Sequence, residues 1–299
     1  MTQLALDEKI YRVGAAEVTR IAECTLDSFT PAALLPEWSA GAASLTDSLL
    51  RATTTADGQR LLLSVHAWLV RDRGRTILID PGVGNDKARP EARYFDRLET
   101  SFLDRLAAAG VAPDQVDYVL MTHLHVDHVG WNTRLAGGRW TPTFPNARHL
   151  FSRKEFEFFT DPANRSERHR TSFRVQQDSV VPVIAAGLAE MIDVDGREAI
   201  SGFAFHPTPG HSPDHASIVL QSGGERAIFA GDVLHHPAQV ERPDLFSIFD
   251  SDRQKTLASR HWALDYAATH DATFFSSHFP ATSAGRVVRR AERYSWRFL

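Results

Sequence analysis

The chain has 299 residues, a formal net charge of −4 and 43% hydrophobic residues, and these values exclude several classes of protein. A slightly acidic chain lacks the broad positive surface that nucleic acids require, so we expect no nucleic-acid partner. Because no leader-like or membrane-spanning apolar run is present, we expect no membrane partner and a cytoplasmic location. The single cysteine, Cys24, cannot form an internal disulfide, which fits a reducing compartment.

The segment from Thr25 to Ala56 shows little periodicity. Prolines, glycines and small residues interrupt the segment from Thr25 to Ala56, so we predict that residues 1–60 are partly an irregular arm or lid. Apolar side chains here and in a later segment can line a substrate pocket, cover the edge of the core or form the interface of a homodimer, and these alternatives stay open. The side chains concerned are Phe29, Leu34, Leu35, Trp38, Trp131, Trp140 and Phe144.

Short apolar runs alternate with helix-like segments along the rest of the chain, which predicts an α/β protein. The expected strands are Leu61–Val70, Thr76–Ile79, Tyr118–Met121, Phe203–Phe205, Ala216–Leu220, Arg226–Ala230 and Thr273–Ser277. The expected helices include Tyr94–Ala109 and Arg253–Thr269. Length alone favours two domains, but the candidate ligands described next are spread over both halves, so we predict one domain over residues 1–299.

Four side chains that can bind metal fall within six residues after the strand that ends at Met121: His123, His125, Asp127 and His128. On an extended backbone His123 and His125 point the same way and can reach one metal. Asp127 and His128, on the loop that follows, can reach a second. This spacing predicts a metallohydrolase with two neighbouring ions.

Three further candidates follow predicted strands. His211 ends the run Pro207-Thr208-Pro209-Gly210-His211, where proline and glycine favour a turn. Asp232 follows Gly231, and its two carboxylate oxygens can bridge two cations. His278 comes directly after the last predicted strand.

The ordered set of His123, His125, Asp127, His128, His211, Asp232 and His278 resembles the metallo-β-lactamase superfamily. The resemblance runs from about Leu61 to His278 and includes the early strand that ends at Asp80. It implies a four-layer αβ/βα sandwich with two mixed sheets flanked by helices. It also implies that His123, His125 and His211 bind one metal, that Asp127, His128 and His278 bind the other, and that Asp232 bridges them.

One departure and one further resemblance narrow the choice of branch within this superfamily. Cys24 lies upstream of every motif, so the thiolate ligand of one lactamase branch is absent. The motif from Gly231 to Pro237 and the later Phe249-Asp250-Ser251-Asp252 resemble the branch of acyl-homoserine lactonases and methyl parathion hydrolase. The resemblance therefore favours a small lactone or activated ester as substrate.

A pair of divalent ions can lower the pKa of a bridging water from about 15.7 towards about 7, so that hydroxide is the nucleophile. We expect Asp127 to take the proton and to return it to the leaving group. Zinc suits imidazole and carboxylate ligands, and iron, manganese and cobalt are alternatives. Asp80 and His215 are the candidates to orient the ligands from behind.

The alternatives are an organophosphate triester hydrolase, a thioesterase resembling glyoxalase II, a β-lactam hydrolase, an iron-dependent redox or sulfur-handling member, and a metal-binding regulator without activity. His66, His206, His261 and His270 are interpreted as core or surface residues. His235 and His236 closely follow Asp232, and one of them is a candidate for lining the pocket. The arginines from Arg286 to Arg297 are interpreted as a solvated face.

Overall fold

Two seven-stranded mixed sheets form the framework of the computed structural model, which describes residues 9–38, 47–291 and 293–299. The chain divides into two compact units, and each has one of these sheets. The first unit holds the described residues up to Cys24 together with Val65–Asp193. The second unit holds Thr25–Ser64, as far as they are described, and Val194–Leu299. Mixed sheets flanked by helices confirm the predicted α/β class; the prediction of a single domain stays a prediction.

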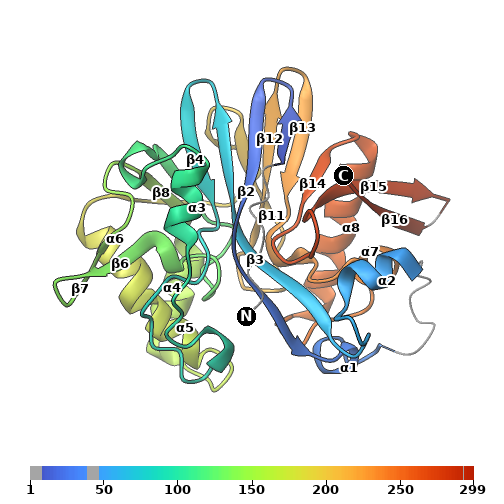
Figure 1. Ribbon diagram of the computed structural model, residues 1–299, viewed down its shortest axis with the longest axis horizontal. Coiled ribbons are helices and arrows are strands. Elements are labelled where there is room, and N and C mark those ends of the chain that lie inside the picture. The colour runs from blue at the N-terminus through green and yellow to red at the C-terminus, as the bar shows by residue number, and fades with distance from the viewer. Residues whose placement is uncertain (1–8, 39–46, 292) are drawn as a thin grey trace. The chain divides into compact units, whose positions relative to one another are not determined.

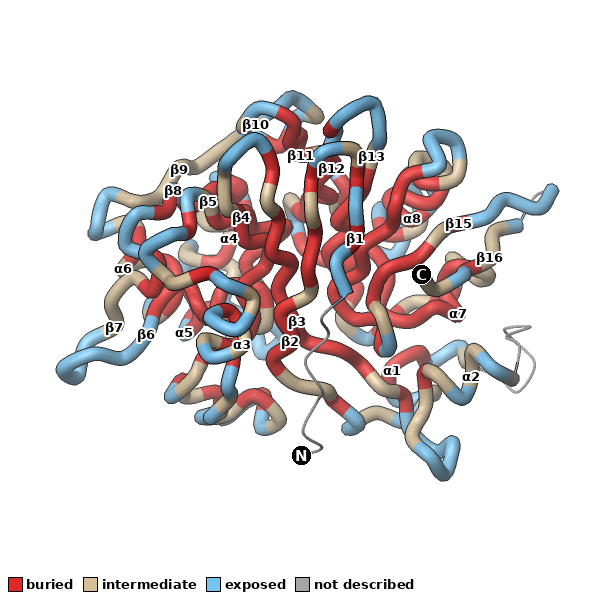
Figure 2. Tube along the Cα trace, turned by 45° about the horizontal axis from the view of Figure 1, so that its top comes forward, coloured by how far each residue is buried: buried red, intermediate tan, exposed pale blue. Residues whose placement is uncertain are grey.

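The sheet of the first unit places the ends of parallel strands side by side. Its strands, in spatial order, are β1 (Ile10–Val13), β2 (Ala16–Phe29), β3 (Leu61–Asp72), β4 (Arg75–Ile79), β5 (Tyr118–Leu120), β8 (Arg148–Ser152) and β9 (Ala189–Ile192). The last four run parallel. Ile79 pairs with Leu120, so the segments that follow β4 and β5 leave the same edge of the sheet. Figure 2 shows β3, β4, β5 and β8 buried over most of their length, whereas β9 is of intermediate burial.

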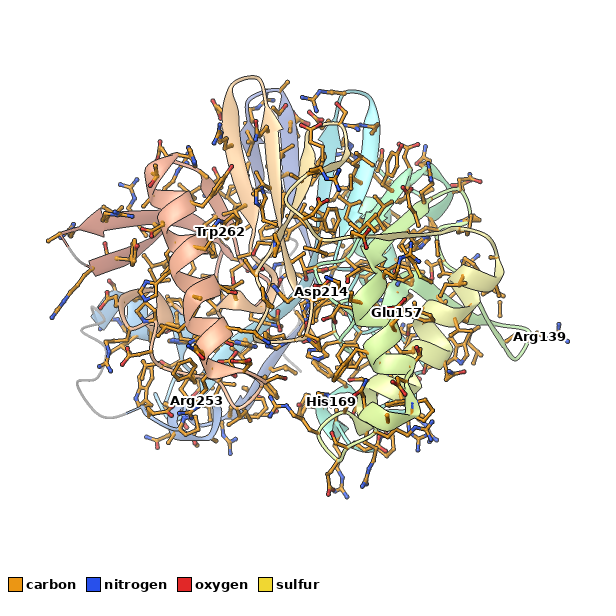
Figure 3. All side chains as sticks on the ribbon, turned by 180° about the vertical axis from the view of Figure 1, so that it is seen from behind. Arg139, Glu157, His169, Asp214, Arg253 and Trp262 are labelled. Atoms are coloured by element: carbon orange, nitrogen blue, oxygen red, sulfur yellow. The ribbon has the colours of Figure 1, made fainter. Side chains whose placement is uncertain are left out.

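Helices and a small hairpin complete the first unit. The helices are α3 (Phe102–Ala108), α4 (Arg153–Thr160), α5 (Arg170–Val175), a π-helical turn (Gln176–Val180) and α6 (Val181–Ala185), with short 3₁₀ helices at Arg93–Phe95, Pro113–Gln115, Gly130–Asn132 and Pro162–Asn164. Strands β6 (Thr133–Ala136) and β7 (Arg139–Pro142) form a separate hairpin. Its exposed tip is pale blue in Figure 2, and Arg139 is labelled there in Figure 3.

The sheet of the second unit is antiparallel except for one pair of strands. Its order is β10 (Glu198–Ile200), β11 (Phe203–Pro207), β12 (Ala216–Ser222), β13 (Glu225–Phe229), β14 (Thr273–Phe275), β15 (Ala284–Arg290) and β16 (Arg293–Phe298). Between the parallel strands β13 and β14 the chain forms a 3₁₀ turn (Gly231–Val233), α7 (Ala238–Glu241) and the long helix α8 (Arg253–Thr269). Figure 1 shows α8 beside β14 and β15. The unit also includes α1 (Pro31–Leu34) and α2 (Asp47–Thr53).

The predicted strands are all present, and α8 begins and ends at the predicted residues. The helix predicted over Tyr94–Ala109 is wrong in its first half, because α3 begins only at Phe102. Long-range backbone bonds hold the earlier residues instead: the amide of Arg97 donates to Lys87 O and the carbonyl of Leu98 accepts from Asp86 N. Tertiary contacts thus override the local helical pattern here.

Residues 1–60, predicted to be partly an irregular arm or lid, also contain regular strands, and the arm or lid stays a prediction. Residues 10–13 and 16–29 form β1 and β2, which pair in an antiparallel hairpin. Leu34 and Leu35 are fully buried, which favours coverage of the core among the alternatives left open for them. Residues 1–8 and 39–46 of the predicted arm lie outside the described residues.

Candidate metal centre

The loop after β5 gathers the four predicted donors of the first unit. His123 Nε2 lies 3.1 Å from His125 Nδ1, and the ring centroids of His123 and His128 are 4.1 Å apart. His128 Nε2 lies 3.7 Å from Asp127 Oδ1. His123 and His128 are buried, whereas His125 and Asp127 are partly exposed. Imidazole nitrogens this close either share a proton or bind the same cation, which makes the loop a candidate metal site.

Asp80 holds this loop in place by accepting hydrogen bonds from it, in agreement with its predicted orienting role. One carboxylate oxygen accepts from the amide of Thr122 at 2.8 Å, and the other accepts from the Thr122 hydroxyl at 2.8 Å. The second oxygen also lies 3.1 Å from His128 Nδ1. A histidine that gives its Nδ1 proton to a carboxylate presents the lone pair of Nε2 to a metal. Asp80 is therefore placed to fix the tautomer of His128.

Two buried side chains that the sequence analysis missed hold the peptide between His123 and His125. The amide of Leu124 donates to Glu155 Oε2 at 3.4 Å, and Gln176 Nε2 donates to Leu124 O at 3.1 Å. Gln176 stands at the start of the π-helical turn, a distortion often found near functional sites. Both the N–H and the C=O group of Leu124, between the two imidazoles, are thus hydrogen-bonded to buried side chains.

Glu23 of β2 ties the metal loop to the turn after β4. Its carboxylate accepts from the amides of Val83 at 2.6 Å and Gly84 at 3.1 Å, and from Trp131 Nε1 at 2.7 Å. Gly82 has φ +50°, and a Cβ there would lie 2.1 Å from Glu23 Oε2, so only glycine fits. Burial raises the pKa of Glu23, while these donors oppose the rise by stabilising the charged form.

Replacing Glu23 with alanine is expected to lower the free energy of unfolding by about 2–4 kcal/mol, because it leaves several buried N–H donors without an acceptor. Urea denaturation of the metal-free protein measures the change. Glu17→Ala removes a carboxylate from the exposed part of the same strand and serves as the control. Equal midpoints for the two variants would contradict the role given to Glu23.

In the second unit, two of the predicted histidines converge on the predicted aspartate. His211 Nε2 lies 3.3 Å from Asp232 Oδ2, and His278 Nε2 lies 3.0 Å from Asp232 Oδ1 and 3.1 Å from Oδ2. All three side chains are buried. Bonds of 2.0–2.2 Å in a tetrahedral zinc site imply about 3.3 Å between neighbouring donor atoms. The spacing of these donors therefore fits shared metal ligation.

Neighbouring groups select the tautomers in this unit as well. His278 Nδ1 lies 3.0 Å from the carbonyl of Ser64, so it donates there and leaves Nε2 to face Asp232. His215 Nε2 accepts from the amide of Asp232 at 2.9 Å, and its Nδ1 lies 2.9 Å from the Thr208 hydroxyl. His215 thus holds the backbone of the aspartate, in agreement with its predicted orienting role.

The structure separates His235 from His236. The ring of His235 stacks on His278 at 5.4 Å, and its Nε2 lies 3.4 Å from Asp232 Oδ2. Neither ring nitrogen of His235 has a hydrogen-bond partner among the described residues, although the side chain is buried. His236 instead lies against Trp38, and burial lowers its pKa to about 3. His235 belongs to the donor cluster, whereas His236 is a core residue.

The remaining histidines agree with their interpretation as structural or surface groups. His66 is buried against Trp68, and His206 is half-buried and stacks on Trp262 at 4.9 Å. Trp262 is labelled on α8 in Figure 3. His261 and His270 are exposed at α8 and at its C-terminal end.

Two of the aromatic residues considered for the pocket, Trp131 and Phe144, pack in the core instead. Trp131 stacks on Phe102 at 5.2 Å, and Phe144 is fully buried. Trp140 lies under the ammonium of Lys87, whose nitrogen is 3.8 Å from the ring centroid. Of the alternatives left open, coverage of the core therefore applies to Trp131 and Phe144.

His149, on β8 and away from the candidate donors, makes stability sensitive to acid. Burial lowers its pKa from 6.5 to about 4. As the pH falls through 6.5 the unfolded chain takes up this proton and the folded chain does not, so stability is lost between pH 6.5 and 4. The contribution is up to about 1.4 kcal/mol for each pH unit.

The pH dependence of the free energy of unfolding between pH 4 and 6.5 is thus expected to be shallower in His149→Asn by about one proton. Protein treated with a chelator excludes release of metal from the comparison. His261→Asn, which removes an exposed imidazole, is expected to keep the slope of the unchanged chain. An unchanged slope in His149→Asn would show that the buried imidazole does not control acid stability.

The chain belongs to the metallo-beta-lactamase superfamily, whose family model matches residues 60–278. N-acyl homoserine lactonase AttM of Agrobacterium fabrum is 28% identical over 187 residues, which are 60% of this chain and 64% of AttM. N-acyl homoserine lactonase AiiA of Bacillus thuringiensis subsp. kurstaki is 24% identical over 176 residues, 55% of this chain and 61% of AiiA. The matched regions thus span less than two thirds of these relatives.

Solved structures show the same fold over nearly the whole chain. Hydrolase AbOPH of the beta-lactamase superfamily has a TM-score of 0.82 and 25% identity, with 99% of each chain covered. AidC, a dizinc quorum-quenching lactonase, has a TM-score of 0.77 and 20% identity, with 97% of each chain covered. The predicted metallo-β-lactamase fold and family are confirmed. Among the described residues, no helix has the length and apolar character needed to cross a membrane.

Proposed function

We propose that this protein is a dinuclear metal-dependent hydrolase that opens small lactones. The observation that carries the proposal is the convergence of His211 and His278 on Asp232 at 3.0–3.3 Å, in a family member that also carries the His123–His128 donor loop. The similarity to the N-acyl homoserine lactonases AttM and AiiA supports a lactone as substrate.

We assign the ligands as the family pattern implies. His123, His125 and His211 would hold one ion, Asp127, His128 and His278 would hold the other, and Asp232 would be shared by the two. The donors are all imidazole or carboxylate groups, which zinc accepts and which iron, manganese and cobalt also accept. Bound divalent cations would supply Lewis acidity, which lowers the pKa of water towards neutrality and polarises an ester carbonyl.

Asp127 is the residue we assign to proton transfer. It is partly exposed, whereas Asp232 is buried, so Asp127 is the carboxylate of the set that solvent and substrate reach. It accepts a proton from the attacking water and returns it to the ring oxygen that leaves. Burial raises the pKa of the neighbouring Tyr94 to about 12, and the charge of Asp127 adds to the rise. Tyr94 therefore stays protonated beside this carboxylate.

Metal analysis of the purified protein, combined with hydrolysis assays, tests the proposal. The assays cover acyl-homoserine lactones, aryl esters, phosphotriesters, glutathione thioesters and β-lactams. We expect two metal ions per chain and the highest kcat/KM on a lactone. Strong thioesterase activity without lactonase activity would overturn the substrate class, and protein without bound metal or hydrolytic activity would overturn the proposal.

A further inference from the structure

One face of helix α8 is buried in the interior of the second unit, and this face is part polar and part apolar. Its buried residues follow helical spacing: Thr256, Ser259, Arg260, Ala263, Leu264 and Ala267. The C-terminal half of this face is apolar and packs into the core. The N-terminal half is polar, although a fully buried arginine is costly unless all its donors are used.

The polar half holds the loop that carries His211. The hydroxyl of Ser259 donates to Pro209 O at 2.7 Å. The carbonyl of Gly210 accepts from the amides of Ser251 and Asp252, both at 2.8 Å. Gly210 has φ +133°, and a Cβ there would lie 2.2 Å from the amide nitrogen of Thr256. The backbone before His211 thus packs directly against the first turn of α8.

Arg260 extends the same support to the turn of Asp232. Its Nε donates to the carbonyl of Val233 at 2.8 Å, and its Nη1 donates to Pro243 O and Leu245 O, both at 2.9 Å. Its Nη2 donates to Asp250 Oδ2 at 2.8 Å. One planar fork therefore joins the residue after Asp232 to the carboxylate of Asp250, a geometry that lysine cannot reproduce.

One carboxylate oxygen of Asp250 binds Arg260, and the other faces His211. Oδ2 accepts from Arg260 and from the amide of Ser247 at 2.7 Å. Oδ1 has no hydrogen-bond partner among the described residues, and the side chain is fully buried. This oxygen lies 3.9 Å from Nδ1 of His211, on the side of the ring away from the nitrogen that faces Asp232.

We propose that Asp250 and Arg260 are a positioning pair for metal ligation by His211. Asp250 Oδ1 is the group placed to take the Nδ1 proton of His211: closing the 3.9 Å gap between the two atoms on metal binding would fix the tautomer and direct the Nε2 lone pair to the metal. Arg260 holds Asp250 in place and balances its buried charge. The inference rests on the proposed function, because it assigns the pair to one ligand of that metal centre.

The test compares isosteric and conservative variants with exposed controls. Asp250→Asn keeps the shape of the side chain, and Arg260→Lys keeps the charge but loses the fork. Asp244→Asn and Arg253→Lys are the matched controls, because Asp244 and Arg253 are exposed and make surface ion pairs. Arg253 is labelled at the first turn of α8 in Figure 3. Zinc affinity is measured by competition with a chromophoric chelator, and stability by urea denaturation of the metal-free protein.

We expect Asp250→Asn and Arg260→Lys to weaken zinc binding by about 10- to 100-fold, as loss of a ligand's supporting group typically does. The controls should stay within about twofold. In a His211→Ala background, Asp250→Asn should weaken zinc binding no further, because the two residues act through one contact. Should Arg260→Lys fail to fold, the Asp250→Asn variant and this double-mutant cycle still decide the question.

An Asp250→Asn variant with unchanged zinc affinity would overturn the inference, as would full additivity with His211→Ala. A lower urea midpoint at unchanged affinity would assign the pair to folding alone and overturn it equally. These outcomes leave the proposed function standing if the unchanged chain binds zinc and opens lactones. Failure of the unchanged chain to bind zinc would instead overturn the proposed function.

Discussion

Substitution of Asp127 by asparagine is expected to lower kcat for lactone hydrolysis by about 10²- to 10⁴-fold, the range that a general acid–base group supplies. The amide keeps one oxygen that can contact a metal but cannot carry a proton between water and the leaving group. The variant should therefore keep part of its metal while losing most of its turnover. Steady-state kinetics and metal analysis of the same preparation measure both quantities.

Asp114→Asn is the matched control, because Asp114 is an exposed carboxylate in the same unit. It is expected to retain the kcat of the unchanged chain. If Asp127→Asn turned over lactones at the same rate as this control, Asp127 would have no part in proton transfer and a different residue would have to be sought.

Replacement of Asp232 by alanine is expected to have the largest effect on metal content. His211 Nε2 and His278 Nε2 both approach its carboxylate, so its loss removes a donor from both proposed ions. We expect the metal content to fall from the proposed two ions per chain to fewer than one, and kcat/KM to fall by more than about 10³-fold, since the ions would supply both the nucleophile and electrophilic assistance.

Circular dichroism and urea denaturation of Asp232→Ala without metal separate loss of metal binding from loss of folding. Retention of two ions per chain would show that Asp232 does not lie between them. Loss of one ion alone, with the other bound as tightly as before, would contradict a bridging position and assign the carboxylate to a single ion.

Much of the fold could be predicted because the candidate ligands closely follow strands that the hydrophobic pattern indicates. The apolar runs that form β5, β13 and β14 are short and are each followed at once by a candidate ligand, so hydrophobic pattern and chemistry point to the same residues. Asp80 could be predicted in the same way, since it ends β4 beside β5.

The supporting residues could not be predicted, because their partners are distant in sequence. Glu23 contacts Val83 and Trp131, and Gln176 contacts Leu124, through bonds that local patterns do not encode. Arg260 carried a usable signal: it occupies a core position in the helical spacing of α8, where a charged side chain needs buried partners. The break before α3 likewise depends on contacts with the distant loop that contains Lys87.

The two units differ in how they prepare their donors. In the first unit a single loop carries four donors, and buried groups hold its backbone and the Nδ1 of His128. In the second unit three separate segments each supply one donor, and β-strand ends, His215 and α8 set their positions. In both, buried groups hold the segments that carry the proposed donors, which would lower the cost of ordering these side chains when a metal binds.

We propose that seven residues hold a pair of metal ions: His123, His125, Asp127, His128, His211, Asp232 and His278. A crystal structure of the zinc-loaded protein, with anomalous data on both sides of the zinc absorption edge, tests it most directly. We expect two anomalous peaks about 3.5–4 Å apart, with Asp232 contacting both. A single peak, or ions bound by only one of the two donor sets, would contradict it.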